Sequence, residues 1–266
     1  YDVPMAKLLD GREIAAYIKE RHFNQVRSLG AAPRLAIVHA TDDPATRIYV
    51  RTKQRYGADI GVEVLEVAVT AGEIAPTIQR LNADPGTGGI IVQLPLPGSI
   101  DSQAVLESIA ASKDVDGLRA DTEYDPATPK GIMWLLAAYG VQLKDRPVAV
   151  IGRGKLIGVP ITRMLEAAGA KVTGCNRTTP DLKAQTLKAD ILVVATGQKY
   201  LLTPDMVKPG AVVIDCGSPD PEIDPALFED ESLMLTPNPG GVGPMTVAAL
   251  FDNLLIAASK SASAQE

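Results

Sequence analysis

Tyr49 and Lys53 are the first residues of the chain whose types and spacing could do chemistry. They are four residues apart in a segment expected to be helical, so their side chains would share one face. A lysine held in an apolar cleft loses hydration, which lowers its pKa and makes its amine a usable acid or base. The simpler alternative is a solvated lysine beside an amphipathic tyrosine.

A second polar group follows an expected buried strand at residues 89–92. Gln93 begins the sequence Gln93-Leu94-Pro95-Leu96-Pro97, in which two prolines stiffen the loop. A glutamine amide can donate to a ligand and accept from a lysine. The alternative is an ordinary strand exit.

Two carboxylates lie close together in Lys113-Asp114-Val115-Asp116-Gly117. With a valine between them, only one is expected to face inward. An ionised aspartate can accept two hydrogen bonds from an amidine-like ring edge such as that of a pterin. Calcium is the competing ligand, but the segment lacks the other ligands of an EF-hand loop.

Residues 147–158 combine a short apolar run, two close glycines and the start of a helix. After the run, Gly152 and Gly154 allow a sharp turn and a close approach to a bound group. Free N–H groups at the following helix would face a phosphate there. The spacing to Gly158 is one residue longer than in the usual dinucleotide fingerprint. A strand–helix turn of any α/β protein is therefore the alternative.

The stretch Thr236–Thr246 contains three prolines and three glycines between Pro237 and Pro244. So few side chains cannot fill a core, but they suit a backbone that approaches a ligand closely. A purely structural loop is the alternative.

These groups must be positioned by alternating strands and helices. Expected strands are 35–39, 62–67, 89–92, 147–151, 171–175, 190–195, 211–215 and 233–235; expected helices are 10–29, 44–60, 75–81, 102–110, 128–139, 160–168 and 245–258. This alternation predicts an α/β fold of two units with parallel sheets, a boundary within residues 119–130 and a cleft between the units. Ligands bind beyond the carboxyl ends of such strands. Gln93, Gly152–Gly154, Thr196-Gly197 and Gly217-Ser218 all fall there.

Composition narrows the class of protein. The 266 residues are 46% hydrophobic and 4% aromatic, which suits an aliphatic α/β core. A net charge of −6 argues against a nucleic-acid surface, and no apolar run is expected to be long enough to span a bilayer. Cys175 and Cys216 are expected to be small buried residues in a reducing compartment. His22 and His39, with so few thiols, predict no metal cluster.

Two expectations concern the ends of the chain. Residues 1–4 precede Met5, which we expect to be the natural start, and no secretory signal is expected. The last six or so residues are expected to be disordered.

In order along the chain, the motifs resemble one family, the bifunctional methylenetetrahydrofolate dehydrogenase/methenyltetrahydrofolate cyclohydrolases. The matching pieces are Asp10-Gly11, Tyr49-Val50-x-x-Lys53, Val92–Pro97, Lys113–Gly117, Thr128-Pro129-x-Gly131-Ile132, Gly152-Arg153, Ile157-Gly158-x-Pro160, Lys208–Ala211 and Pro239–Thr246. Each piece alone is modest, but the ordered set is highly specific and runs from end to end of the chain.

The resemblance implies two domains. Residues 1–125 with 245–266 would form the folate-binding catalytic domain, and 126–244 a Rossmann-type NADP-binding domain. Lys53 resembles the catalytic lysine, Gln93 the neighbour that orients it, Tyr49 the tyrosine on the folate ring and Asp116 the carboxylate on the pterin edge. The other implied substrate-binding residues are Val92, Leu94, Pro239, Gly240, Gly241, Val242 and Gly243.

For the cofactor, the resemblance implies NADP, bound by Gly152, Arg153, Gly154, Ile157, Arg177, Thr196, Gly217 and Ser218. Arg177 follows the strand ending at Cys175, where an NAD enzyme would favour Asp or Glu. Guanidinium groups there and at Arg153 suit a 2′-phosphate. The alternative is a pair of surface arginines.

The sequence departs from the family at three places. The family usually has Ser or a close variant where this chain has Gly154, so one phosphate contact is expected to be weaker. The stretch between Gly117 and Thr128 is short and lacks an Asn-x-Gly segment, and the stretch between Ser218 and Thr236 is short as well. These departures concern the shape of the cleft and the dimer contact more than the chemistry.

The implied activity is oxidation of 5,10-methylenetetrahydrofolate with NADP, followed by hydrolysis of the methenyl product to 10-formyltetrahydrofolate. The resemblance further implies a cytoplasmic homodimer in one-carbon metabolism, which feeds purine biosynthesis, with a small folate as substrate and no nucleic-acid or membrane partner. Two alternatives are a monofunctional dehydrogenase and a nucleotide-binding protein without turnover.

Overall fold

The computed structural model describes residues 5–98 and 100–263 of the chain. The expectations for residues 1–4 and for the last three residues lie outside this range, whereas residues 261–263, expected to be disordered, belong to the final helix. The chain divides into two compact units. One contains Thr128–Thr246 and the N-terminal residues up to Ala15; the other contains Ala16–Ala127 and the residues from Val247 onward. We call them the six-stranded and the three-stranded unit.

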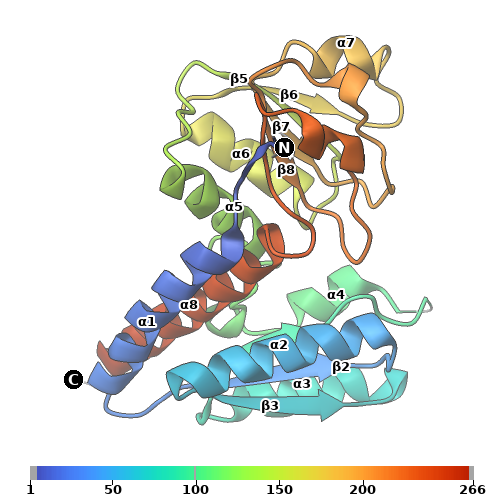
Figure 1. The fold of residues 1–266 in the computed structure, drawn as a ribbon. Coiled ribbons are helices and arrows are strands. Elements are labelled where there is room, and N and C mark those ends of the chain that lie inside the picture. Colours follow the sequence, from blue (N-terminus) through green and yellow to red (C-terminus); the bar gives the residue numbers. More distant parts are fainter. Residues whose placement is uncertain (1–4, 99, 264–266) are drawn as a thin grey trace. The chain divides into compact units, whose positions relative to one another are not determined.

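The three-stranded unit is built on a parallel sheet in the order β3-β2-β4, seen in the lower part of Figure 1. Its strands are β2 (Arg34–His39), β3 (Glu63–Ala68) and β4 (Thr87–Val92). Its helices are α2 (Pro44–Ile60), α3 (Ile74–Ala83) and α4 (Ser102–Glu107). The central strand is fully buried from Leu35 to Val38, as a parallel strand covered on both faces requires. The carboxyl ends of β2 and β4 are adjacent, because Gln93 N donates to Val38 O at 2.8 Å.

The six-stranded unit has an all-parallel sheet in the order β1-β9-β8-β7-β5-β6. Its strands are β1 (Lys7–Leu8), β5 (Pro147–Ile151), β6 (Lys171–Cys175), β7 (Ile191–Val194), β8 (Val212–Asp215) and β9 (Met234–Leu235). Its helices are α5 (Ala127–Ala138), α6 (Gly158–Ala167) and α7 (Leu182–Thr186). The chain passes from β5 to β6 on one side and later to β7 on the other. The strand order therefore reverses beside β5, where such sheets bind ligands.

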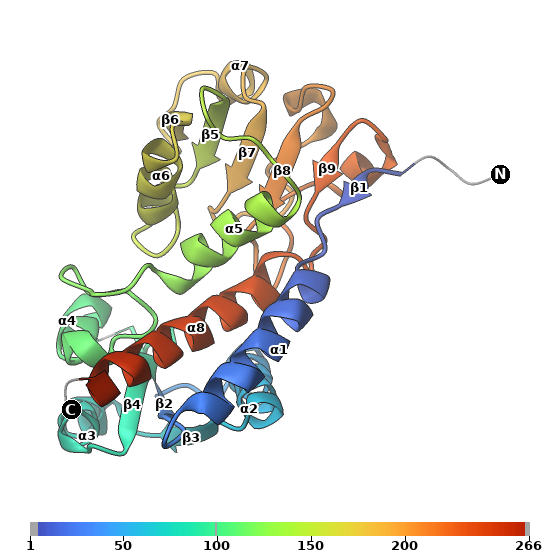
Figure 2. The same ribbon diagram turned by 90° about the vertical axis from the view of Figure 1, so that its left-hand side faces the viewer.

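Two long helices pass from one unit to the other along the chain, α1 (Gly11–Ser28) and α8 (Val242–Ser263). Within the three-stranded unit they lie side by side (Figure 2). A buried polar group joins them there: His22 Nε2 lies 3.2 Å from Asp252 Oδ1, and His22 Nδ1 lies 3.0 Å from Tyr56 Oη on α2. The ring of Tyr56 stacks on Phe251 of α8. These contacts fix α2, the helix that carries Tyr49 and Lys53.

The start of α1 explains the Asp10-Gly11 pair. The Asp10 carboxylate caps the helix by accepting from Arg12 N at 2.8 Å. Gly11 N donates to Gly240 O at 2.9 Å, and a Cβ on Gly11 would lie 1.9 Å from Gly241 O. Only glycine allows the loop around Gly240 to pack this closely on α1.

The α/β class and the two parallel sheets are as the sequence predicted. The expected division differs at the N-terminus, because β1 pairs with β9 and residues up to Ala15 belong to the six-stranded unit. β1 and α7 were not expected; two residues of strand and five of helix leave no periodic signal. α8 is longer than the expected 245–258, and α4 ends at Glu107 rather than at 110.

One expectation about the membrane was wrong. The stretch Val242–Ser261 of α8 is long and apolar enough to cross a bilayer by length and composition, with a mean hydropathy of 1.4. Most of it is buried inside the protein, 61% of the most apolar window, as expected of a core helix.

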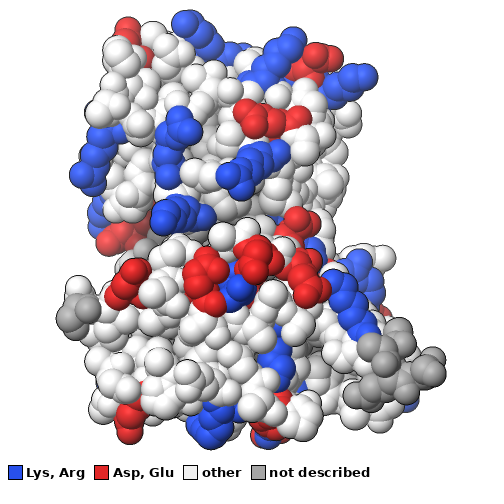
Figure 3. Space-filling view, turned by 180° about the vertical axis from the view of Figure 1, so that it is seen from behind, with Lys and Arg blue, Asp and Glu red and all other residues white. Residues whose placement is uncertain are grey.

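Over the described residues, the surface carries charges of both signs and the cysteines form no disulfide (Figure 3). Both signs of charge occur on the face in Figure 3, where acidic side chains gather in a band. Cys175 is buried and Cys216 is partly exposed; both are free thiols whose pKa burial raises. No group of three or more His, Cys, Asp or Glu among these residues could hold a metal ion.

Candidate active site

Lys53 lies at the centre of a polar site in the three-stranded unit. It projects from α2 and is only 7% exposed. Its Nζ donates to Gln93 Oε1 at 2.8 Å, just beyond the end of β4. Burial lowers the pKa of Lys53, while the nearby charge of Asp116 acts in the opposite direction. The amine can therefore lose its proton more easily than a solvated lysine.

Gln93 is fixed in one orientation. Its Nε2 donates to Leu94 O at 3.0 Å, so the side-chain oxygen is the atom turned toward Lys53. The flanking residues secure the backbone: Val92 is buried in the aliphatic core, and Leu94 packs against it. The amide thus acts as a rigid acceptor that aims the lysine amine.

Tyr49 lies one helical turn before Lys53 and shares its face, as the spacing predicted. The Lys53 Nζ lies 5.9 Å from the centre of the Tyr49 ring. The ring is half-buried, and burial raises the pKa of its hydroxyl. It offers a flat neutral surface beside the amine.

Of the two carboxylates in the turn after α4, Asp116 belongs to this site. Burial raises the pKa of Asp116 to about 6, against the opposing charge of Lys53. No hydrogen bond from a described side chain or backbone amide reaches its carboxylate. A partly buried carboxylate in this state can accept two donors from a ligand edge.

Asp114 and Lys113 instead hold the local structure. Asp114 is fully buried and accepts from Leu118 N at 3.3 Å and Arg119 N at 2.9 Å. Lys113 Nζ donates to the carbonyls of Leu81, Asn82 and Asp84 at the end of α3. The turn is therefore held from behind, and only Asp116 is left for a ligand.

The glycine turn of the six-stranded unit has the geometry of a phosphate site. Gly152 has φ +112°, and a Cβ there would lie 2.0 Å from Ala195 O. A Cβ on Gly158 would lie 2.1 Å from Gly152 O, so both glycines are required for α6 to close on the turn. Ile157 precedes α6 and offers no side-chain cap. Val159 N donates to Gly154 O at 3.0 Å and Pro160 has no N–H, so Gly158 supplies the amide of the first three helical residues that is left for an anion.

The two arginines lie at the edge expected for the adenosine half of a dinucleotide. The Arg153 guanidinium lies beside β6, with Nη1 3.7 Å from the Cβ position of Gly174. Arg177 is exposed in a turn held by Asn176, whose Oδ1 accepts from Thr178 N at 2.8 Å. Gly154 has no atom within 4 Å of its Cβ position, so the departure to glycine here is not a steric requirement. The residues present fit a phosphorylated dinucleotide.

Other predicted cofactor residues have partners within the protein. Thr196 N donates to Glu222 Oε2 at 2.7 Å, and the Thr196 hydroxyl donates to the same oxygen. Gly217 N donates to Asp215 Oδ1 at 2.7 Å, and Gly217 O accepts from Asn238 Nδ2 at 2.7 Å. These residues shape the carboxyl ends of β7 and β8, where Ser218 also lies. Glu222 and Asp215, both buried, were missed because no sequence spacing marks them.

The loop Pro239–Gly243 belongs to the six-stranded unit and is anchored against α1. Gly240 has φ +120°, and a Cβ there would lie 2.9 Å from Arg12 Nε. Gly241 N donates to Pro237 O at 2.8 Å. The loop is rigid and poor in side chains, with Val242 already the first residue of α8.

A parallel sheet in which β5 leads through this glycine turn into a helix without a side-chain cap defines a Rossmann-type nucleotide-binding unit. The three-stranded unit contains a buried lysine and, near it, a carboxylate that accepts no hydrogen bond from the described residues. Two such titratable groups are typical of the active site of an acid–base enzyme.

Comparison with known proteins identifies the family. Residues 9–116 match the catalytic domain of tetrahydrofolate dehydrogenase/cyclohydrolase, and residues 126–262 match its NAD(P)-binding domain. The chain belongs to the tetrahydrofolate dehydrogenase/cyclohydrolase family. The family expected from the ordered motifs is thereby confirmed.

Individual relatives are similar to this chain over nearly its whole length. The Bifunctional protein FolD of Bordetella avium (strain 197N) is 39% identical over 283 residues, covering 96% of this chain and 98% of the relative. The solved FolD of Campylobacter jejuni is 36% identical with a TM-score of 0.90, over 96% of this chain and 99% of its own. A Trypanosoma brucei FolD complexed with NADP cofactor and inhibitor is 30% identical with a TM-score of 0.90, over 97% and 99%.

Proposed function

We propose that the chain oxidises 5,10-methylenetetrahydrofolate with NADP and then hydrolyses the methenyl product to 10-formyltetrahydrofolate. Membership of the family supports both reactions. The observation that carries the proposal is the 2.8 Å hydrogen bond from the buried Lys53 to Gln93. A nucleotide-binding protein without turnover would not need such a pair.

In the first reaction the requirement is geometric. N5 and N10 of the folate stabilise the cation that forms, so no strong base is needed. Bound NADP supplies the hydride acceptor. The glycine turn at Gly152, the start of α6 and the arginines Arg153 and Arg177 would hold its phosphates. Tyr49 and Asp116 of the three-stranded unit would hold the folate ring, so that the reacting carbon is presented in one orientation.

In the second reaction Lys53 moves protons. One N–H of its neutral amine donates to Gln93 Oε1, which leaves the lone pair to take a proton from the attacking water. The resulting ammonium can return a proton to N5 as the ring opens. Gln93 cannot itself accept the proton at neutral pH, so its role is to aim the amine and tune its charge.

Asp116 would hold the pterin edge. Its carboxylate is open to a ligand and, once ionised, can accept two parallel N–H groups. Tyr49 would lie against the pterin ring, since an aromatic face stacks on a flat heterocycle at low entropic cost. Val92 and Leu94 would contribute through the backbone around Gln93, because their side chains face the core.

For the cofactor, NADP is favoured over NAD by charge. No acidic residue follows β6 in the sequence Cys175-Asn176-Arg177, and Arg177 is exposed there. Arg153 lies beside the same strand end. Two guanidinium groups can pair with a 2′-phosphate, whereas the unphosphorylated ribose gains nothing from them.

Three wider expectations belong to the same proposal. The protein would act as a homodimer in the cytoplasm, and its product would supply one-carbon units for purine biosynthesis. The family relationship supports the one-carbon role. The free thiols Cys175 and Cys216 suit a reducing compartment.

The decisive experiment follows both reactions by absorbance. The purified protein is mixed with methylenetetrahydrofolate and NADP, and NADPH formation is recorded; methenyltetrahydrofolate alone is then added and its decay recorded. We expect both signals. NADPH formation without accelerated methenyl decay would indicate a monofunctional dehydrogenase, and nucleotide binding without either signal would indicate a non-catalytic protein.

A further inference from the structure

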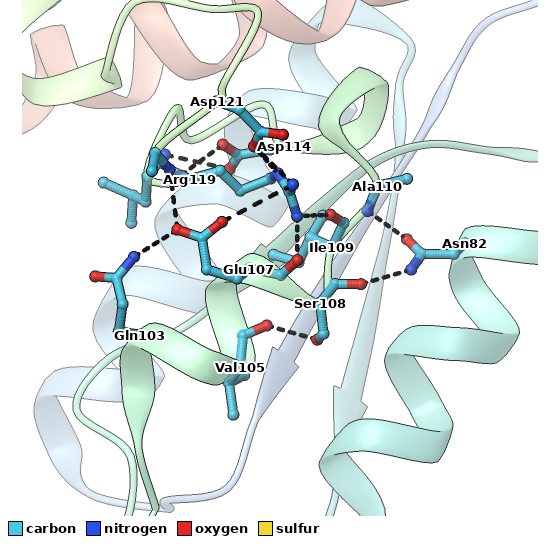
Figure 4. Close-up of polar contacts among 12 residues, drawn as sticks. Asn82, Gln103, Val105, Glu107, Ser108, Ile109, Ala110, Asp114, Arg119 and Asp121 are labelled. Atoms are coloured by element: carbon cyan, nitrogen blue, oxygen red, sulfur yellow. Dashed lines mark hydrogen bonds and ion pairs between the residues drawn. The ribbon is translucent and has the colours of Figure 1, made fainter.

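Arg119 forms the centre of a dense polar cluster at the carboxyl end of α4 (Figure 4). Its side chain is only 13% exposed. Nη1 donates to the carbonyls of Glu107 and Ile109, the latter at 2.6 Å, at the carboxyl end of α4. Nε donates to Asp121 Oδ1 at 2.8 Å. One guanidinium thus joins the end of α4 to the segment that follows Asp116.

The backbone around Arg119 is bound to the same cluster. Arg119 N donates to Asp114 Oδ2 at 2.9 Å, and Ala120 N donates to Glu107 Oε1 at 3.0 Å. Glu107 is itself held by Gln103 Nε2 at 2.7 Å. The bond between Arg119 N and Asp114 therefore closes residues 114–120 into a loop, and the bond from Ala120 N to Glu107 fastens the far end of this loop to α4.

Asp116 lies inside this loop without a fastening of its own. Its backbone carbonyl accepts from Ala127 N at 3.1 Å, but its carboxylate receives no hydrogen bond from the described residues. On one side, the Val115 carbonyl accepts from Asn253 Nδ2 at 2.9 Å. On the other side, Gly117 N donates to Asp114 O at 3.1 Å, and the chain beyond it is held through Arg119 and by the bond from Ala120 N to Glu107. The position of the carboxylate is therefore set by these anchors, of which Arg119 makes the largest number of bonds to the carboxyl end of α4.

We propose that Arg119 is a positioning residue that holds the Asp116 carboxylate at the distance from Lys53 needed to bind the folate ring. The segment between Gly117 and Thr128 is short in this chain, and the bonds from Arg119 to α4 give it a fixed path. This inference rests on the proposed function, because it assigns Asp116 to the folate edge. Arg119 itself touches no substrate and acts through the loop.

The test is a double-mutant cycle on the full-length protein. Arg119→Gln, Asp116→Asn and the double variant are compared, with Arg119→Lys as a milder change and Arg146→Gln as a control that removes an exposed arginine paired with Asp190 in the six-stranded unit. The readouts are the KM and kcat for methylenetetrahydrofolate, the Kd of tetrahydrofolate and of NADP by calorimetry, and the Tm.

We expect Arg119→Gln to raise the KM and the Kd of tetrahydrofolate by about tenfold, with kcat and the Kd of NADP nearly unchanged. Arg119→Lys should have KM and Kd values between those of Arg119→Gln and the unaltered protein, because a lysine can donate to one carbonyl but lacks the several N–H donors of a guanidinium. In the Asp116→Asn background the same substitution should add almost nothing. Arg146→Gln should leave all the binding constants unchanged.

Two outcomes would overturn the inference alone. One is a folded, active Arg119→Gln protein with an unchanged KM; the other is an equal rise in KM with and without Asp116, which would mean a general structural role. Should Arg119→Gln fail to fold, Arg119→Lys is measured with and without Asp116→Asn instead. The inference then requires that Arg119→Lys raise the KM only when Asp116 is present. An unaltered protein without either activity would overturn the proposed function, and this inference with it.

Discussion

Lys53 Nζ and Gln93 Oε1 are joined by a 2.8 Å hydrogen bond between residues 40 positions apart in the chain. Lys53 lies on a helix and Gln93 lies just beyond a strand, and separate contacts fix the position of each. The helix is fixed by Tyr56 packing on Phe251, and the glutamine by its bond to Leu94 O. The amine is therefore already oriented in the absence of substrate, and proton transfer requires such an orientation.

Removing the amine should abolish hydrolysis. We expect Lys53→Met to lower the rate of methenyltetrahydrofolate decay by at least about 10²-fold, because the variant lacks the amine that takes the proton from water. The matched control is Lys19→Met, which removes a partly exposed lysine paired with Asp59. Decay at the unaltered rate in Lys53→Met would exclude this role for Lys53.

Adding a charge at Gln93 should move the pH profile. A carboxylate in Gln93→Glu would stabilise the protonated amine and so raise the pKa of Lys53, which burial lowers in the native protein. Because the neutral amine is the base, the rising limb of the cyclohydrolase rate should shift to higher pH. The exposed control Gln142→Glu carries the same charge change away from the site. A limb that stays in place would contradict the assignment of the base.

The Asp116 carboxylate should set the acid limb of folate binding. With a pKa of about 6, it is ionised above that pH and protonated below it. The dehydrogenase kcat/KM should therefore fall as the pH drops below about 6, with KM rising and kcat changing less. Asp116→Asn should raise KM by about tenfold or more and remove this limb, since an amide does not titrate in this range. A limb that survives in Asp116→Asn would belong to another group.

Arg177 should determine the choice of cofactor. Arg177→Ala would remove one guanidinium from the end of β6 and should lower kcat/KM for NADP about ten- to hundredfold, with little effect for NAD. Lys171→Ala, at the opposite end of the same strand and paired with Asp145, serves as the control. Equal losses for the two cofactors would show that Arg177 does not contact the 2′-phosphate.

The glycine turn offers a pair of substitutions with opposite outcomes. Gly152→Ala places a methyl group 2.0 Å from Ala195 O at φ +112°, so it should destabilise the protein by roughly 2 kcal/mol and weaken NADP binding. Gly154→Ser meets no neighbouring atom and adds a hydroxyl that can reach a phosphate. It should leave the Tm unchanged and tighten the Kd of NADP several-fold, by about 1 kcal/mol. Calorimetry and thermal melts measure both; a weaker Kd in Gly154→Ser would refute the expected contact.

The sequence was sufficient to predict most of the elements because their hydrophobic runs are long and bounded by glycine, proline or capping residues. The helix that begins at Gly11 follows its capping aspartate, and β5 is bounded by Pro147 and Gly152. β1 could not be predicted, since its two residues are ordered only by pairing with β9, more than two hundred positions away. The pairing of the N-terminus with the second sheet is likewise a long-range effect.

The sequence predicted those site residues whose role depends on the type of side chain. It did not predict those whose role depends on a hydrogen bond to a segment distant in sequence. Lys53, Gln93 and Asp116 stand out by type and by position at strand or helix ends. Arg119 and Glu222 do not, because their importance lies in bonds to the carbonyls and amides of segments distant in sequence. Thr196 illustrates the converse: its hydroxyl and amide are both taken by Glu222, so a residue expected to contact cofactor acts first on the protein.

The interleaving of the two units along the chain constrains how such a protein can be modified. The polypeptide starts in the six-stranded unit, leaves it after Ala15, returns at Thr128 and leaves again after Thr246. No single cut therefore separates the two units into intact pieces, and a shuffled enzyme with a foreign nucleotide-binding half would need three junctions, which fall within helices α1, α5 and α8. Changes of cofactor preference in such a lineage are accordingly expected to come from point substitutions in the turns after β5 and β6 rather than from exchange of a whole module.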